Sequence, residues 1–121
     1  MVYASTTRAL ACLETLVHLS TSLFPFNRYL VEIVVPATLW EAASEFDPKK
    51  WVGWDAEPIG AVSLNWGTRW VTGMTSVLAR VPSVIVPEEF NVLINPAHPD
   101  AGRIKSVKVR KWLYDPRLGA R

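Results

Sequence analysis

Two polar residues of this sequence stand in apolar surroundings, and both could carry chemistry. Ser83 follows Pro82 within "SVLARVPSVIVP", a segment that otherwise has the pattern of a buried strand. Glu14 lies in "ALACLETLVHL", on the flank of an apolar stripe typical of a helix. Each residue also has a purely structural explanation. The serine hydroxyl could bond a free backbone group where the strand is interrupted, and Glu14 could pair with His18 or Arg8 on its own helix.

Other common catalytic patterns are weak here. A Ser-His-Asp triad would need Ser83, His98 and either Asp100 or Asp115. However, Val84 follows the serine, whereas such nucleophiles sit on a sharp turn flanked by glycine. The two histidines of the sequence lie far apart and have no neighbouring carboxylate pattern, so no metal site is expected. The glycines of "GTRWVTG" have the wrong spacing for a phosphate-binding loop.

The composition predicts one soluble globular domain. The chain has 121 residues, of which 50% are hydrophobic and 20% charged. Its net charge of +2 is too small to indicate direct binding to nucleic acid. The single cysteine, Cys12, rules out a disulfide framework and suits a small apolar helix position better than a catalytic role. We see neither a membrane-spanning run nor a signal peptide, and therefore expect a cytoplasmic protein without a membrane partner.

The order of predicted elements favours an α+β fold with an antiparallel or mixed sheet and few helices. A short β-prone segment, "MVYAS", precedes a helix that Ser5 or Thr6 could cap. "RYLVEIVVP" has the pattern of a largely buried strand, residues 37–58 that of a long loop with one helical turn, and "IGAVSLNWGTRWVTG" that of a helix. Further strands are expected in "SVLARVPSVIVP", "NVLIN" and "RIKSVKVRKWLYD". In the last of these, valines alternate with Lys108 and Arg110, which predicts a half-exposed strand with a solvated basic face.

Several of these segments together resemble the RES domain, the toxin of a class of bacterial toxin–antitoxin pairs. The matching pieces are "VYAS", "ALACLETLVHL", "YLVEIVVP", "WGTRW", "VPSVIVPEEFNVLINPAHPD" and "YDPRL", in the same order and spacing. The likeness covers residues 2–118, nearly the whole chain, and the fifth piece is the most specific. The resemblance implies an ADP-ribosyltransferase-like core, a mixed or antiparallel β-sheet with a few flanking helices, in a protein that consumes NAD.

The RES family takes its name from an arginine, a glutamate and a serine. Matched residue by residue, the glutamate falls on Glu14 and the serine on Ser83, while Tyr3 matches an aromatic residue beside the site. The family's arginine lies in a Gly-Arg-Trp-like segment upstream of that tyrosine. Arg8, Arg28 and Arg69 do not occupy this motif. We therefore expect residues 1–121 to form a single RES-like domain that is N-terminally truncated relative to the family.

The resemblance implies the toxin of a type II toxin–antitoxin system that cleaves NAD at the nicotinamide–ribose bond, with water, phosphate or a protein side chain as acceptor. Glu14 and Ser83 are then the expected catalytic residues, Tyr3 and Ser83 the residues that bind NAD, and all three should line one cleft. NAD is the substrate, no metal is expected, and the implied partner is an Xre-like antitoxin protein. The missing arginine segment leaves an alternative, a catalytically inactive or truncated RES-like domain that only binds a partner.

Overall fold

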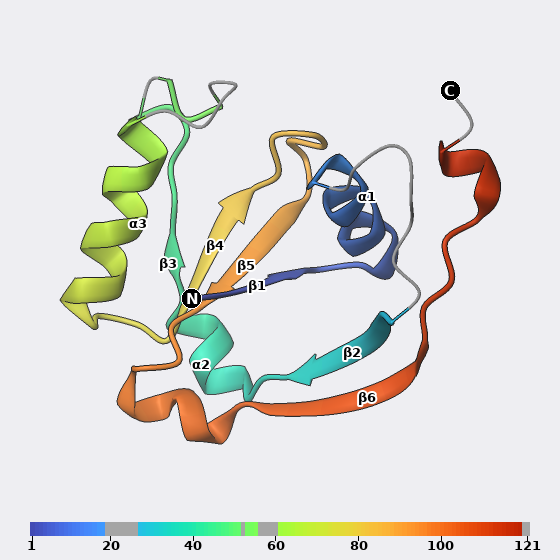
Figure 1. The fold of residues 1–121 in the computed structure, drawn as a ribbon. Coiled ribbons are helices and arrows are strands. Elements are labelled where there is room, and N and C mark those ends of the chain that lie inside the picture. Colours follow the sequence, from blue (N-terminus) through green and yellow to red (C-terminus); the bar gives the residue numbers. More distant parts are fainter. Residues whose placement is uncertain (19–26, 52, 56–60, 120–121) are drawn as a thin grey trace.

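The chain folds into two β-sheets flanked by helices (Figure 1). The computed structural model describes residues 1–18, 27–51, 53–55 and 61–119. A four-stranded sheet has the order β1-β5-β4-β3, and a two-stranded sheet pairs β2 with β6. The strands are β1 (Val2–Ser5), β2 (Tyr29–Val34), β3 (Ser44–Glu45), β4 (Leu78–Pro82), β5 (Phe90–Ile94) and β6 (Lys105–Lys111). The helices are α1 (Arg8–His18), α2 (Ala37–Glu41) and α3 (Ala61–Gly73), with 3₁₀ helices at Pro99–Arg103 and Pro116–Gly119.

This arrangement confirms the expected α+β class. The larger sheet is mixed, because β5 pairs antiparallel with β1 and β4 while β3 runs parallel to β4. The predicted helix in "IGAVSLNWGTRWVTG" is α3, and the predicted strands in "MVYAS" and "NVLIN" are β1 and β5. Within the described ranges, every helix is too short or too polar to cross a membrane.

The register of the larger sheet assigns its side chains to two faces, because residues paired across strands point to the same side. The first face carries a core cluster shared with α2: Leu39, Val77, Leu78, Val92 and Ile94. The second face carries a cluster shared with α3: Trp70, Ala79 and Leu93. Residues of β1 alternate between these faces, and this alternation decides on which side the candidate site residues lie.

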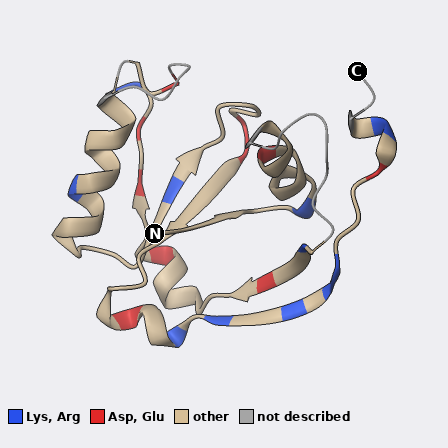
Figure 2. Ribbon diagram, viewed as in Figure 1, with Lys and Arg blue, Asp and Glu red and all other residues tan. Residues whose placement is uncertain are grey.

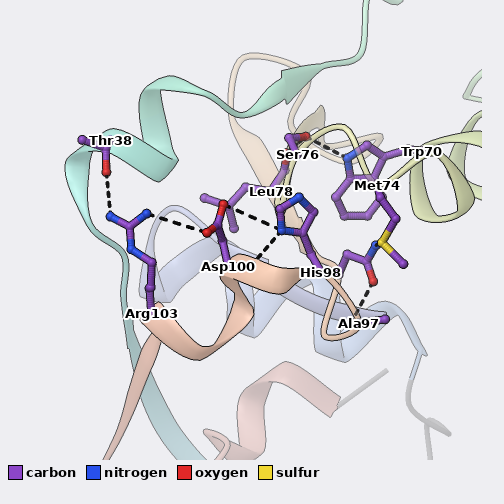
Figure 3. Close-up of polar contacts among 10 residues, drawn as sticks. Thr38, Trp70, Met74, Ser76, Leu78, Ala97, His98, Asp100 and Arg103 are labelled. Carbon is purple, nitrogen blue, oxygen red and sulfur yellow. Dashed lines mark hydrogen bonds and ion pairs between the residues drawn. The ribbon is translucent and has the colours of Figure 1, made fainter.

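Buried polar side chains fix α3 on the second face. The indole nitrogen of Trp70 donates to the Ser76 hydroxyl at 3.0 Å, and that hydroxyl donates to the Leu78 carbonyl at 2.8 Å. The Asn95 amide, 1% exposed, donates to the Val71 carbonyl at 3.1 Å. Figure 3 shows part of this network, which joins the end of α3 to the neighbouring sheet. Because these buried groups are all paired, they stabilise one position of the helix rather than several.

The start of α1 differs from the sequence-based expectation. Thr7 caps the helix by accepting a hydrogen bond from the Leu10 amide at 3.1 Å. Ser5 is the last residue of β1, and the Thr6 hydroxyl donates to the Phe90 carbonyl instead. The expected apolar stripe is also only partly covered, since Leu10 is buried whereas Leu13 and Val17 of the same stripe are exposed.

The expected burial of "RYLVEIVVP" is wrong. The exposed fractions of Tyr29, Val31 and Val34 are 50%, 46% and 47%. Among the described strands β2 pairs only with β6, and Ile33 is the strand residue that packs against the core cluster of the larger sheet. An apolar strand is buried on both faces only where layers cover both, and this two-stranded sheet has no second covering layer in the described chain.

The last strand, β6, is present where the sequence predicts it, but all seven of its residues are exposed rather than every second one. Figure 2 shows that basic residues are distributed along this strand. Two of them lie over aromatic rings of the same sheet region, Lys108 over Tyr29 at 4.3 Å and Arg110 over Trp112 at 4.8 Å. On an exposed strand, Lys and Arg side chains commonly pack their aliphatic part along apolar surface while the charged group stays in contact with water.

The segment 37–58 contains more regular structure than the predicted loop with one helical turn. It holds α2 and the two-residue strand β3, whose Ser44 pairs with Ala79 and whose Glu45 pairs with Arg80. Residues 52 and 56–58 of this expected loop lie outside the described residues. The same is true of residues 23–26, most of the "LFPFN" segment expected to break the first helix.

Candidate active site

The position of Ser83 is set by the end of β4. Pro82 is the last residue of that strand and pairs with Phe90, and its missing N–H prevents a further ladder bond on that residue. The chain then turns: the Ser83 amide donates to the Glu89 carbonyl, and the Glu89 amide donates to the Val86 carbonyl, both at 2.9 Å. The strand expected to resume after Ser83 is therefore absent, and residues 83–89 form a loop that returns to β5.

The Ser83 hydroxyl holds this loop and Glu14 at the same time. Its oxygen accepts hydrogen bonds from the amides of Ile85 and Val86, each at 3.1 Å. Its proton is donated to Oε1 of Glu14 at 2.6 Å. The serine is 0% exposed, and the structural explanation considered from the sequence is present, because its oxygen satisfies free backbone groups. The same hydroxyl also contacts the carboxylate.

A second donor reaches the same carboxylate oxygen. Nδ2 of Asn91, the second residue of β5, donates to Oε1 of Glu14 at 2.8 Å. Oδ1 of Asn91 in turn accepts from the hydroxyl of Ser5 at 2.7 Å. Ser5, Asn91, Glu14 and Ser83 therefore form a continuous row of hydrogen bonds, which we call the Glu14 row. Hydrogen bonds to a charged acceptor are short and stronger than neutral ones, so this row fixes the half-buried carboxylate.

Two further contacts position the helix that carries Glu14. The Thr6 amide donates to the Phe90 carbonyl at 3.2 Å, and the Thr7 hydroxyl donates to Oε1 of Glu89 at 3.3 Å. Leu10, one turn before Glu14 on the same side of α1, is 2% exposed. The first turn of the helix is thus tied to the β4–β5 loop, and its buried side brings Glu14 to the ends of β4 and β5.

Tyr3 lies on the same face of the sheet as the Glu14 row. It is two residues before Ser5 on β1 and pairs with Leu93, which belongs to the second face. Its side chain is 72% exposed, and in the described chain no hydrogen bond or ring contact joins it to Glu14 or Ser83. The structure therefore brings Glu14 and Ser83 into direct contact, whereas the exposed Tyr3 ring has no described contact with either of them.

A large groove lies next to these residues but is not centred on them. Its volume is about 1100 Å³, and it runs between β1, α1 and β2, with the aromatic residues Trp40, Trp112 and Tyr114 among its walls. Tyr3 and Ser5 of the edge strand line it, whereas Glu14 and Ser83 do not. Of the three residues expected to share one cleft, only Tyr3 borders this groove.

The alternative Ser-His-Asp triad is not assembled. Nδ1 of His98 accepts from the Asp100 amide at 3.0 Å, which caps the 3₁₀ helix beginning at the next residue (Figure 3). Asp115 pairs with Arg117 at 2.7 Å, and the hydrogen bonds of that guanidinium lower the pKa of the Asp115 carboxyl. The described partners of the Ser83 hydroxyl are Glu14 and two backbone amides, so His98 is not placed to activate it as a nucleophile.

The arrangement suits electrostatic stabilisation rather than nucleophilic attack by the serine. Oε1 of Glu14 accepts two hydrogen bonds, while Oε2 accepts none from the residues that the structure describes. The described part of the chain also contains no ion pair to Glu14 from Arg8 or any other cation, and the side chain of His18 lies outside the described residues. A fixed carboxylate with one free oxygen can stabilise positive charge that develops on a nearby carbon atom.

Two members of the Glu14 row were not nominated from the sequence. Asn91 stands at the start of a predicted strand, where asparagine is common as a turn residue, and Ser5 was considered only as a helix cap. The signal that could have found them is strand alternation. Tyr3, Ser5 and Asn91 share one face only if β1 and β5 are paired in the observed register, and the sequence alone does not give that register.

Comparisons with known proteins agree on one family. A family model described as the RES domain matches residues 1–116. The chain is 59% identical over 119 residues to the Prs ADP-ribosylating toxin of Sphingobium sp., a match that covers 98% of this chain and 74% of that protein. It is 33% identical over 121 residues to Toxin Res of Yersinia enterocolitica, covering 97% of this chain and 76% of that protein. It is 36% identical over 120 residues to Toxin Res of Pseudomonas putida, covering 98% and 79%.

Proposed function

The chain belongs to the RES domain family, and from this premise we propose that it is the catalytic domain of a toxin that cleaves NAD at the nicotinamide–ribose bond. The observation that carries the proposal is the Glu14 row, in which two donors fix one oxygen of a carboxylate while the other accepts no hydrogen bond from the residues that the structure describes. The name of the Sphingobium relative supports it, because NAD is the donor of ADP-ribose in ADP-ribosylation. A toxin that acts on NAD works in the cytoplasm, which we include in the proposal.

In the proposed reaction, Glu14 stabilises charge on the ribose. The bond between the ribosyl carbon and the nicotinamide nitrogen breaks, and its electron pair leaves with nicotinamide, which becomes neutral. Positive charge then develops on the ribosyl carbon and ring oxygen, where the carboxylate is most effective. The acceptor forms the new bond to that carbon and gives up its proton. A single contact of this kind contributes roughly 3 kcal/mol to the transition state, or about 100-fold in rate.

The roles of the other two predicted site residues follow from their exposure. Ser83 is 0% exposed and all its described bonds are internal, so in this proposal it acts through Glu14 and not by contact with NAD. This replaces the direct NAD contact inferred from the resemblance. Tyr3 is 72% exposed on the same face and is free to stack on the nicotinamide or adenine ring.

The acceptor can be water, phosphate or a protein side chain. The relative at 59% identity has the name Prs ADP-ribosylating toxin. This name favours a protein side chain as the acceptor in the reaction of this chain as well. The relatives named Toxin Res carry no acceptor in their names. We therefore propose ADP-ribosyl transfer to protein as the first reaction to examine, and hydrolysis or phosphorolysis as the others.

The test is to incubate the purified protein with NAD and to follow nicotinamide by chromatography. We expect nicotinamide to accumulate, with the ADP-ribose moiety recovered by mass spectrometry on an added protein, on phosphate or free. The three products identify the three acceptors. If the folded protein releases no nicotinamide but still binds its antitoxin, the chain is an inactive partner-binding domain and the proposed activity is wrong.

An antitoxin partner is part of the proposal, since the named relatives are toxins and a cell must restrain an enzyme that consumes NAD. The resemblance makes an Xre-like protein the expected partner of this type II system. We propose that the C-terminal end of this antitoxin covers the exposed Tyr3 ring and the approach to the half-buried Glu14, and so competes with NAD. Deleting the last residues of the antitoxin should then restore nicotinamide release. Full inhibition by the shortened antitoxin would contradict this mode of binding.

A further inference from the structure

We infer that Asn91, itself oriented by Ser5, is a positioning residue that turns the free oxygen of Glu14 towards the substrate. This inference rests on the proposed function, because it concerns the same carboxylate. Neither residue was nominated from the sequence as part of the site, and both enter it through contacts between segments distant in the chain: 77 residues separate Asn91 from Glu14, and 86 separate Ser5 from Asn91.

The first step of the argument is that one donor cannot fix a carboxylate. The terminal torsion of a glutamate is broad and roughly two-fold, so the group can rotate about a single hydrogen bond. Here Oε1 accepts from Ser83 at the end of β4 and from Asn91 at the start of β5, at 2.6 and 2.8 Å. One donor directly follows β4 and the other lies in the adjacent strand β5, and together they hold that oxygen against the sheet. Oε2, which accepts no hydrogen bond from the described part of the chain, is left as the atom that can face a ligand.

The second step concerns the orientation of the Asn91 amide. An asparagine side chain has a donor end and an acceptor end of almost identical shape, and the acceptor end would repel a carboxylate. The Ser5 hydroxyl donates to Oδ1 at 2.7 Å, which leaves Nδ2 as the end that faces Glu14. Ser5 and Asn91 are directly paired between β1 and β5, so the sheet register itself sets this contact. Ser5 therefore favours the orientation of the Asn91 amide in which Nδ2 donates to Glu14.

The third step is that no described cation forms an ion pair with the Glu14 carboxylate. The ion pairs of the described chain join Arg80 to Glu45, His98 and Arg103 to Asp100, and Arg117 to Asp115, as a complete set that excludes Glu14. Among the described residues the carboxylate is held by two neutral donors, so no described cation offsets its charge towards the ribosyl cation. Removal of one neutral donor should therefore affect the rate of the chemical step more than the binding of NAD.

The experiment compares Asn91→Ala, Ser5→Ala and Ser5→Thr with the unchanged protein and with a control, Ser106→Ala on the exposed strand β6. Loss of a hydrogen bond to a charged group predicts a fall in kcat of about tenfold or more for Asn91→Ala, with KM for NAD changed by less than about threefold. Ser5→Ala should lower kcat by several-fold, and Ser5→Thr, which retains the hydroxyl on a β-branched residue suited to a strand, should restore it to within about twofold. Ser106→Ala should leave both constants unchanged.

Crystal structures of the unchanged protein and of Asn91→Ala supply a second readout that does not depend on activity. We expect the Glu14 carboxylate to rotate or to occupy two orientations in the variant. An unchanged kcat, or an unchanged carboxylate orientation, overturns the role of Asn91 even where the unchanged protein cleaves NAD. If the unchanged protein releases no nicotinamide, the proposed function fails by itself, and the carboxylate orientation still decides whether Asn91 positions Glu14.

Discussion

Replacing Glu14 with glutamine is expected to lower nicotinamide release from NAD by roughly 100-fold or more while leaving the fold intact. The two side chains have almost the same shape, and the amide oxygen of glutamine can still accept the hydrogen bonds from Ser83 and Asn91. What is lost is the negative charge next to the ribosyl carbon. The measurement is the initial rate of nicotinamide release, together with thermal unfolding followed by circular dichroism.

The matched control for this substitution is Glu41→Gln, at the exposed C-terminal end of α2. It removes the same charge from the protein far from the Glu14 row in the chain, and we expect its rate to equal that of the unchanged protein. Nicotinamide release by Glu14→Gln at the parental rate would refute the catalytic role of Glu14. Equal losses in Glu14→Gln and Glu41→Gln would show that the effect is one of overall charge.

The second large effect is expected for Ser83→Ala, which should reduce both stability and activity. The hydroxyl is the acceptor for two backbone amides of the loop and the donor to Glu14, and the residue is 0% exposed. Alanine leaves these amides without their acceptor and the carboxylate with one donor fewer. We expect the free energy of unfolding to fall by about 1–3 kcal/mol and kcat to fall by about tenfold or more.

Urea denaturation and NAD kinetics on the same preparation measure these two effects. Ser106→Ala again serves as the control, since its side chain lies on the exposed strand β6. A loss of stability without a loss of kcat would mean that Ser83 only closes the loop after β4. A loss of kcat without a loss of stability would mean that the two backbone hydrogen bonds to its oxygen contribute little.

The fold was largely predictable where local patterns are long. The helical pattern of α3 and the apolar segment of β5 were each placed correctly to within a few residues, and β4 begins where expected but ends at Pro82 instead of continuing past Ser83. Two errors have physical causes. The two-residue strand β3 is too short to show any period, and it exists only because β4 offers a parallel edge. The burial of β2 was overestimated because apolar composition predicts burial only where a second layer is present to cover the strand.

The candidate site was predictable only in part, and only through the resemblance. Spacing alone gave Glu14 and Ser83 adequate structural explanations, and nothing local predicts a contact between residues 69 positions apart. That contact depends on the loop that follows Pro82 and on the turn of α1 that Leu10 anchors. Asn91 was missed because its role depends on the pairing of β5 with β1, a long-range property of the sheet.

The most direct measurement is a crystal structure of the Glu14→Gln variant with NAD, because the slowed reaction should leave the dinucleotide intact. The proposal predicts that the nicotinamide ribose lies against the side chain at position 14, on the sheet face that holds Asn91 and Tyr3. NAD bound in the groove between β1 and β2, with its ribosyl carbon away from position 14, would contradict it.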